Sequence, residues 1–350
     1  MCGGMRGFFP CSFVRILVDH RVRERIEQAE HHLLSSFASL ASRSLGRKRE
    51  EPADPIRTCF QRDRDRILHS KSFRRLKHKT QVFIAPTGDH FRTRLTHTLE
   101  VSQIARTVSR ALRLNEDLTE AIALGHDVGH PPFGHTGEQA LDECLKKSGS
   151  GDFTSFRHYE QSLRVLEVLE DLNLTHETLA GIGGHSKGRN DLSAFDGEAV
   201  STLEAAVVRV SDRIAYLSHD IDDAIRAGVI AGLPERFGWL GQSQSQRIKA
   251  MVYDVVEHSI DQPCVQMSSR MLESMNDLKE WMFDHVYLAP DRVRTEAAEA
   301  KQVVHDLFAH FSRPENLACG YEGITGTVDY ISGMTDRFAL SVAESIRRSV

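Results

Sequence analysis

Apolar residues recur along most of this chain at intervals of three and four positions, the spacing of one face of an α-helix. A helix predicted from residue 92 to 112 carries a stripe made of Val101, Ile104, Ala105, Val108 and Leu112. A longer one, predicted from residue 202 to 227, carries Val207, Val210, Ile214, Leu217, Ile221 and Ile225. We find no sustained alternation of apolar and polar residues, the pattern of a half-buried strand. The pattern therefore predicts an all-α protein.

Shorter helices follow from the same spacing. They are predicted at residues 22–34, 115–127, 138–145, 156–169 and 178–182, and over most of the chain from residue 247 onward. In the first of these, Val22, Ile26, Ala29 and Leu33 would form the apolar face. Residues 81–84 could form a short strand, and the polar stretch 186–197 is predicted to be a loop.

Composition and charge narrow the class of protein. The 350 residues carry 44 Lys and Arg against 49 Asp and Glu, a net charge of −5, which argues against a protein that mainly coats nucleic acid. No apolar run is long enough to span a membrane. The six cysteines are scattered without a C-x-x-C pair, and residues 1–21 lack the order of a signal peptide. We therefore expect a cytoplasmic protein with free thiols, preceded by a disordered extension over residues 1–21.

Residues 125–138 combine three histidines, an aspartate, a glutamate, four glycines and two prolines. Glycine and proline disfavour a helix, and five ionisable groups cannot be buried without partners. Histidine and carboxylate are, however, ligands for divalent metals. The neighbours His126 and Asp127 can reach one metal only near a helix end, which Pro131 predicts. For an isolated His-Asp pair, a loop of solvated histidines is the alternative.

Two other helices supply matching groups. His97 lies on the buried side of the helix at 92–112, where a hydrogen-bonded core histidine is the alternative. Asp212, Tyr216 and Asp220 share one face of the helix at 202–227, although an ordinary polar face would look the same. One metal could then take two imidazoles and two carboxylates, from His97, His126, Asp127 and Asp212. Such a set favours Mn²⁺, Mg²⁺, Fe²⁺, Co²⁺ or Ni²⁺ over a thiolate zinc site, and the metal would act on a phosphoryl group.

Further groups fit phosphate-ester hydrolysis with general acid–base help. His135 and Glu138 lie three residues apart, so the carboxylate could fix the tautomer of the imidazole. Arg94, His130 and His158 could face phosphate. The basic segment 62–79 is either a solvated helix with salt bridges or a phosphate-facing wall anchored by Ile67, Phe73 and Leu76.

The order His97, His126-Asp127, Asp212 resembles the H…HD…D pattern of the HD-domain metal phosphohydrolases. More specifically, residues 55–83, 94–138 and 202–228, and the sequence Gly-Met-Thr-Asp-Arg at 333–337, resemble bacterial dGTPase-like proteins. The resemblance covers the chain from Val22 to about Ala339. It implies an HD-type helical core over residues 22–255 and a helical C-terminal extension over 256–350 that completes the pocket and the oligomer contacts.

The resemblance also implies an activity and its partners. The reaction would be metal-dependent hydrolysis of a deoxynucleoside triphosphate (dNTP) at the α-phosphate, giving deoxynucleoside and inorganic triphosphate. The protein would be a homo-oligomer (dimer, tetramer or hexamer), with a second dNTP as an allosteric activator. The alternatives are an HD phosphohydrolase for another nucleotide, and a nucleotide sensor or regulator that binds single-stranded nucleic acid.

Residue roles are carried over by motif. His97, His126, Asp127 and Asp212 would be the metal ligands. His135 would transfer a proton, oriented by Glu138. Contacts to substrate would come from Arg94 and His158 at the phosphates and from Gln81, Tyr216 and Asp220 at the sugar. One position departs from the pattern: Tyr159 stands where many relatives have asparagine, so a contact made by that asparagine is not expected here.

Overall fold

The computed structural model describes residues 21–81, 92–149, 154–185, 201–287 and 291–348, and for 291–294 the backbone alone. The predicted extension at 1–20, most of the possible strand at 81–84 and the predicted loop at 186–197 lie outside these residues. The α-helices in the described part are α1 (Val22–Leu33), α2 (Cys59–His69), α3 (Lys71–Arg75), α4 (Arg94–Ala111), α5 (Glu116–Gly125), α6 (Gly134–Ser148), α7 (His158–Arg164), α8 (His176–Gly184), α9 (Leu203–Arg226), α10 (Gln244–Ser259), α11 (Ser269–Met282), α12 (Asp291–Phe311), α13 (Gly323–Ser332) and α14 (Asp336–Arg348).

The described residues also form short 3₁₀ and π segments: η1 (Ala41–Arg43), η2 (Leu76–His78), η3 (Val165–Leu169), η4 (Glu235–Leu240), η5 (Phe283–Tyr287) and η6 (Pro314–Asn316). The only β pairings in the described part are two isolated bridges, Arg47 with Thr175 and Thr80 with Thr93. The all-α prediction is therefore confirmed. No helix among the described residues has the length and apolar character needed to cross a membrane, and the four described cysteines are free thiols.

Polar caps decide where the helices begin. Thr93, Asn115 and Thr202 each accept a hydrogen bond from a backbone N–H in the first turn of α4, α5 and α9. The helix predicted to start at Glu138 begins four residues earlier, at Gly134, directly after Phe133 in a left-handed conformation. Glu138 consequently lies in the second turn of α6, one turn after His135.

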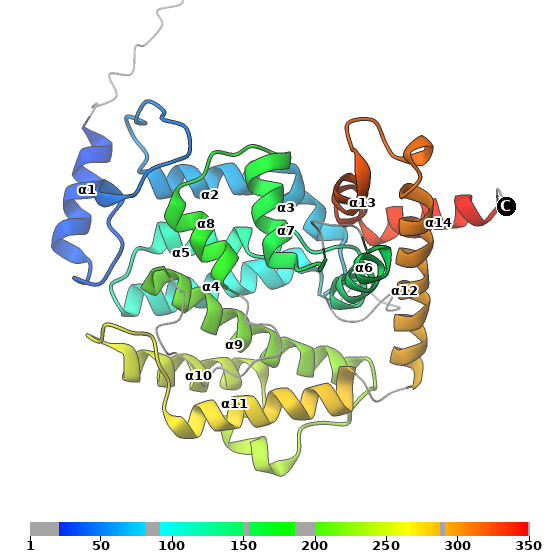
Figure 1. The fold of residues 1–350 in the computed structure, drawn as a ribbon. Helices are drawn as coiled ribbons and strands as arrows, with labels where there is room; N and C mark the ends of the chain where they lie inside the picture. The colour runs from blue at the N-terminus through cyan, green and yellow to red at the C-terminus, as the bar shows by residue number, and fades with distance from the viewer. Residues whose placement is uncertain (1–20, 82–91, 150–153, 186–200, 288–290, 349–350) are drawn as a thin grey trace, which may run out of the picture.

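The larger apolar core lies between α2, α4, α5 and α8 to α11, with α10 and α11 packed against α9 (Figure 1). The predicted stripe of α4 is buried in it completely, and so is that of α9 except for Ile225, which is 42% exposed in the last helical turn. That part of the prediction is wrong. In α1, the predicted apolar residues Val22, Ile26 and Ala29 are half-buried, but the prediction is wrong for Leu33, which is 67% exposed. Glu30 is buried instead, and it accepts hydrogen bonds from Ala41 N and Asn115 Nδ2.

A second apolar core joins α6 to α12, α13 and α14 (Figure 1). Ala140, Leu141 and Leu145 of α6 pack there with Val304 and Leu307 of α12. The helix that follows the histidine-rich segment is thus held by the C-terminal part of the chain. The predicted domain boundary at residues 255 and 256 stays a prediction.

Buried polar contacts reinforce this junction. The side-chain nitrogen of Lys79 donates to the backbone carbonyls of His130 and Ser332. The carboxylate of Asp336 accepts from the backbone N–H and the hydroxyl of Thr80, and from the backbone N–H of Phe133 at 3.0 Å. The segment between the prolines and α6 is therefore fixed from the C-terminal side.

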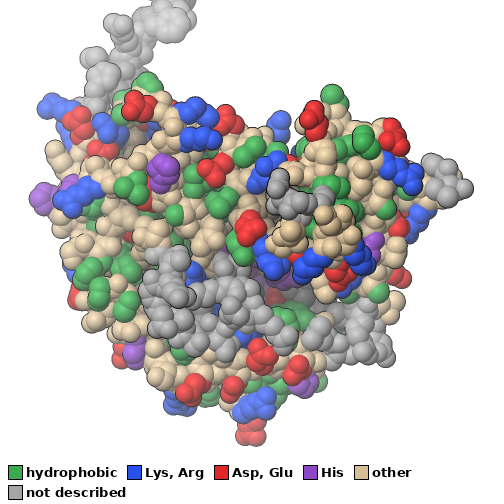
Figure 2. Space-filling view, viewed as in Figure 1, with side chains coloured by type: hydrophobic (Ala, Val, Ile, Leu, Met, Phe, Trp, Pro, Cys, Tyr) green, Lys and Arg blue, Asp and Glu red, His purple; other side chains and the backbone are tan. Residues whose placement is uncertain are grey.

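The first turns of the basic segment 62–79 form salt bridges. Arg62 and Arg66 both pair with Glu51, and Arg64 pairs with Asp117. Its apolar residues Ile67, Phe73 and Leu76 are buried as anchors. The face drawn in Figure 2 shows acidic and basic side chains interspersed among its coloured atoms. The solvated, salt-bridged interpretation therefore fits the start of this segment.

Candidate active site

Two glycines let the His126-Asp127 pair lie where α5, α7 and α8 meet. A Cβ at Gly125, the last residue of α5, would lie 2.4 Å from the Ile182 side chain of α8. A Cβ at Gly129 would lie 2.2 Å from the backbone nitrogen of Ser162 in α7. A side chain at Gly129 would meet the backbone of α7 and push that helix away, whereas one at Gly125 would displace the Ile182 side chain, so Gly129 above all sets the position of the turn that carries the pair.

The four predicted metal ligands converge at this point. Nε2 of His97, from the first turn of α4, lies 3.0 Å from Oδ1 of Asp212 on α9 and 3.9 Å from Oδ2 of Asp127. Nε2 of His126 lies 3.5 Å from Oδ1 of Asp127 and 3.9 Å from Oδ1 of Asp212. Ligand atoms of His97, His126 and Asp127 lie within 4.8 Å of one another. The structure thus brings all four side chains together, from α4, from α9 and from the turn that follows α5.

Hydrogen bonding shows that these residues fit a divalent cation. Nδ1 of His126 lies 2.6 Å from the carbonyl oxygen of Ala123 and must donate to it, since a carbonyl only accepts. In the neutral imidazole, the form that binds a metal, Nε2 then carries a lone pair, and this atom is buried without a hydrogen-bond partner among the described residues. A buried, unsatisfied acceptor costs about 1–3 kcal/mol. A cation held with Asp127 and Asp212 would remove that cost.

The charges around the two carboxylates agree with this fit. Burial opposes ionisation of Asp127, but the nearby His126, His130, Arg94 and His97 outweigh it and hold its pKa well below the usual range. The pKa of Asp212 is likewise lowered, because the hydrogen bond from His97 and the charge of His126 outweigh burial. Both carboxylates are therefore ionised at neutral pH, as metal binding requires.

Arg94 lies beside the pair with donors to spare. Its side chain is 1% exposed, and Nη1 donates to Oδ2 of Asp127 at 2.6 Å. Its Nε and Nη2 are buried without hydrogen-bond partners in the described part of the chain. Nη2 would lie 2.7 Å from a Cβ at Gly134, and the glycine leaves that space open. Such a guanidinium is suited to binding an anion at this place.

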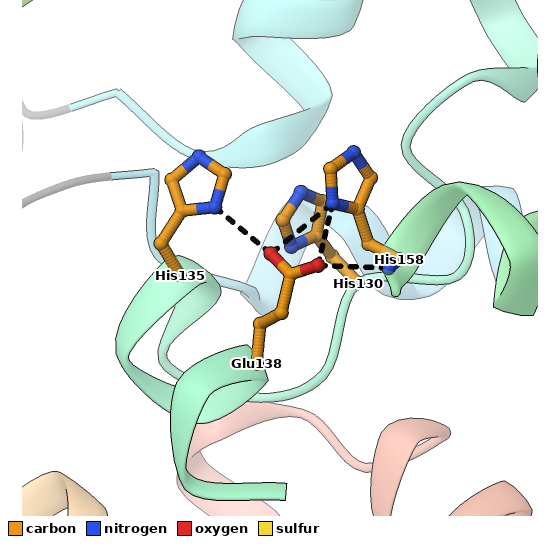
Figure 3. A group of neighbouring side chains, drawn as sticks. All are labelled: His130, His135, Glu138 and His158. Carbon is orange, nitrogen blue, oxygen red and sulfur yellow. Dashed lines mark hydrogen bonds and ion pairs between the residues drawn. The ribbon is translucent and has the colours of Figure 1, made fainter. Parts of the chain in front are cut away.

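A group of histidines around one carboxylate forms the other side of the site (Figure 3). Nδ1 of His135 lies 3.0 Å from Oε2 of Glu138, and the His135 side chain is 74% exposed. Glu138 also accepts from the backbone N–H of His158 at 2.9 Å and faces its Nδ1 at 3.0 Å. The His130 ring stacks on that of His158 with centroids 4.0 Å apart.

This environment keeps Glu138 ionised. Burial would raise its pKa, but the charge of His158 and the hydrogen bonds from His135 and His158 outweigh burial and hold the pKa well below the usual range. An ionised Glu138 accepts the Nδ1 proton of His135, which leaves the other ring nitrogen of this exposed histidine available for proton transfer.

The residues predicted to contact the sugar lie on α9 beyond Asp212. Tyr216 is half-buried and Asp220 is buried. Burial raises the pKa of Asp220 to about 7, although the hydroxyl of Tyr287 donates to its carboxylate. Gln81, also predicted to contact the sugar, does not lie on α9 but beside the start of α6, where its backbone oxygen is 3.2 Å from the position of a Cβ at Gly134. Its side-chain oxygen is buried without a hydrogen-bond partner in the described part of the chain.

Comparisons with known proteins agree with this geometry. The model of the HD domain matches residues 94–217, and that of the phosphohydrolase-associated domain matches residues 265–345. A protein of Caldanaerobacter subterraneus subsp. tengcongensis, named deoxyguanosinetriphosphate triphosphohydrolase-like protein, is 51% identical over 91% of this chain and 94% of its own. A protein of the same name from Desulfatibacillum aliphaticivorans is 48% identical over 93% of this chain and 97% of its own. Another, from Clostridium perfringens, is 45% identical over 91% of this chain and 95% of its own.

The chain belongs to this dGTPase-like family of HD phosphohydrolases. A crystal structure of a hypothetical protein from Aquifex aeolicus, 22% identical, superposes on 80% of this chain and 67% of its own with a TM-score of 0.44, too low to support further inference.

Three residues near this HD phosphohydrolase site were not predicted from the sequence. His185 directly follows α8 and is 3% exposed, with its pKa lowered to about 3 by burial and by the neighbouring charges of His126 and His158. His219 is buried with its ring centroid 5.5 Å from that of His97. Tyr287 in η5 reaches Asp220 from α9. Only His219 has a sequence signal, since it lies two helical turns after Asp212 and so shares its side of α9.

Proposed function

We propose that this protein hydrolyses deoxynucleoside triphosphates at the α-phosphate, releasing deoxynucleoside and inorganic triphosphate. One observation carries the proposal: a His-Asp metal set, an arginine with free donors and a His-Glu pair share one site. His130 joins the two halves, because its Nε2 lies 3.4 Å from Oδ1 of Asp127 and its ring centroid lies 5.0 Å from that of His135. The printed name of the relatives supports a triphosphohydrolase.

The metal would be held by His97, His126, Asp127 and Asp212. When bound, a divalent ion such as Mn²⁺ supplies Lewis-acid polarisation of a phosphoryl oxygen and a more acidic bound water. Arg94 would donate its free Nε–H and Nη2–H groups to the α-phosphate, and its bond to Asp127 would orient it. The stacked rings of His130 and His158 would line the phosphate side.

The proton would be handled at Nε2 of His135. Glu138 holds Nδ1–H, fixing one tautomer and raising the basicity of the ring. The high exposure of His135 lets the ring meet a substrate that enters from solvent. A positioned imidazole of this kind contributes about 10²–10⁴-fold to rate.

The sugar would lie along α9. Asp220 would bind the 3′-hydroxyl, Gln81 would contact the sugar from the side of Gly134, and the Tyr216 ring would pack against C2′ and leave no room for a ribose hydroxyl. A close-packed wall that a 2′-hydroxyl would meet, with no partner for that hydroxyl, selects the deoxy substrate. The protein would act as a homo-oligomer, with a second dNTP as activator bound between subunits.

A product assay tests this function. The protein with Mn²⁺ is incubated with each dNTP singly and with all four, and products are resolved by chromatography. Deoxynucleoside plus triphosphate is expected, lost in His126→Ala and His135→Ala. Activity only in the mixture would reveal the activator. Release of pyrophosphate or phosphate would overturn the reaction geometry, and no turnover with any metal would favour a nucleotide sensor.

A further inference from the structure

A cavity of about 320 Å³ lies between α3, η3 and α13. It reaches Val128, the residue after Asp127, but none of the four proposed metal ligands lines it, and neither do His135 and Glu138. Its volume is in the range of cavities that bind small molecules. The proposed reaction makes no use of it.

The two carboxylates that line this cavity already have partners. Glu170 accepts hydrogen bonds from two backbone N–H groups at the start of α3, at 2.8 and 2.6 Å. Asp329 accepts from the guanidinium of Arg164 and from the side-chain amide of Gln161. Both acids are therefore held by groups other than the basic side chains of the cavity.

Those basic side chains have no such partners. Lys71 and Arg75 of α3 line the cavity and are exposed, and within the described residues their side chains make no hydrogen bond or ion pair. A Cβ at Gly333 would lie 3.1 Å from Nη1 of Arg75, so the glycine lets the guanidinium lie close to the end of α13. Exposed cations without partners are common, and by themselves they would not indicate a ligand.

Lys79 adds a buried basic group to the same cavity. Its side-chain nitrogen donates to the carbonyl oxygens of His130 and Ser332. A charged amine has a third N–H, for which the described part of the chain supplies no acceptor. Burial lowers the pKa of Lys79, and the positive charge of Arg75 adds to that effect. Two basic groups thus lie close enough to repel each other, and an anion bound beside both would remove the repulsion.

We propose that this cavity binds a small phosphate-type oxyanion, held by Arg75, Lys71 and Lys79. A guanidinium donates paired N–H groups to phosphate oxygens, and an ammonium binds them as a point charge. The half-buried Tyr321 lines the cavity as well, and its hydroxyl has no hydrogen-bond partner in the described ranges, so it is a further donor. Donors from three separate segments of the chain therefore converge on one anion.

An anion here would act on the turn that carries the HD pair. Val128 directly follows Asp127 and lines the cavity, and Lys79 holds the carbonyl of His130. A bound oxyanion would keep Lys79 charged, and a charged donor binds the carbonyl of His130 more strongly than a neutral amine does. The turn would then be held more firmly. This inference depends on no step of the proposed reaction.

Calorimetric titration of the full-length protein, stripped of metal, tests the proposal with inorganic phosphate and separately with inorganic triphosphate. We expect the Kd of the bound anion to rise about 10–100-fold in Arg75→Gln, because a hydrogen bond to a charged group is lost. Arg74→Gln is the matched control, since this exposed neighbour donates to the carbonyl of Ser70 and does not line the cavity; its Kd should equal that of the parent protein. Binding of phosphate would identify the free ion as the ligand, and binding of triphosphate alone a polyphosphate.

Equal affinity in the parent protein and a folded Arg75→Gln would overturn the proposal, and so would a parent protein that binds neither anion. Arg94→Gln shows whether the anion binds at the candidate active site instead: its affinity should be unchanged, and a loss of binding in this variant alone would also overturn the proposal. Should Arg75→Gln fail to fold, judged by circular dichroism, Lys71→Gln removes an exposed side chain and should weaken binding as well. The titration uses neither metal nor turnover, so its outcome is separate from that of the dNTP assay.

Discussion

Lys79 joins the HD core to the C-terminal region, and its protonation should govern how the stability of the protein depends on pH. Its side chain is 2% exposed and donates to the carbonyl oxygens of His130 and Ser332. Burial lowers the pKa of Lys79 from 10.5 to about 7, although Asp336 favours the charged form. A neutral amine has two N–H groups, as many as there are carbonyls to satisfy.

The number of protons bound by the folded and unfolded states decides whether the free energy of unfolding rises or falls with pH. Between about pH 7 and about pH 10.5, Lys79 carries a proton in the unfolded chain but not in the folded protein. The free energy of unfolding therefore rises with pH in this window, by about 1.4 kcal/mol per unit. In Lys79→Met this contribution is absent. From about pH 7.5 to about pH 9.5, the stability difference between the parent protein and the variant should grow by about 2.7 kcal/mol.

Urea unfolding at several pH values measures this difference. Methionine is similar in length to lysine and uncharged, but it leaves two buried carbonyls without a donor, so the variant should be less stable throughout the window. Lys77→Met removes an exposed lysine two residues away and should give a difference that does not change with pH. A constant difference for Lys79→Met as well would refute the reasoning, because it would mean that Asp336 outweighs burial and Lys79 stays charged.

Other predictions test the site and its support. Glu138→Gln should lower kcat by about 10²–10⁴-fold. Glu143→Gln is the control, since Glu143 lies on the same helix and pairs with Lys301, and its kcat should not change. Equal losses of kcat in both variants would argue against a specific role for Glu138. Leu141→Ala should lower the free energy of unfolding in urea by about 2–5 kcal/mol, and a negligible change would contradict the packing of α6. Removing divalent metal with a chelator should lower Tm, since an ion at a hundred times its Kd stabilises by about 2.7 kcal/mol; His126→Ala should lessen this response.

The positions of the four proposed metal ligands could be predicted because each lies on, or directly after, a helix with clear periodicity. The stripe of α4 predicts that His97 faces the core, and the helix break before Pro131 frees His126 and Asp127 to turn inward. The face shared with Tyr216 and Asp220 predicts that Asp212 lies beside the buried stripe of α9. Periodicity alone does not predict that α4, α9 and the end of α5 meet at one point. That expectation came from the resemblance to the HD-domain phosphohydrolases.

Contacts across long separations in the chain could not be predicted in this way. Periodicity defines the buried face of a helix but not the helix that covers it. Tyr287 reaches Asp220 across 67 residues, and Asp336 reaches Phe133 across 203. Leu33 was placed wrongly for the same reason, because an apolar position at helical spacing is buried only where a neighbour packs on it.

The position of His135 depends on this long-range packing. Phe133, two residues earlier, has φ of 64°, a conformation that costs a non-glycine residue about 1–2 kcal/mol. Two contacts offset that cost: its ring is 3% exposed within the second apolar core, and its N–H donates to Asp336. Without them the chain would relax and α6 would start in another direction. The C-terminal region therefore acts on the position of His135 through Phe133, so weakening the second core should disturb His135 before it disturbs the proposed metal ligands.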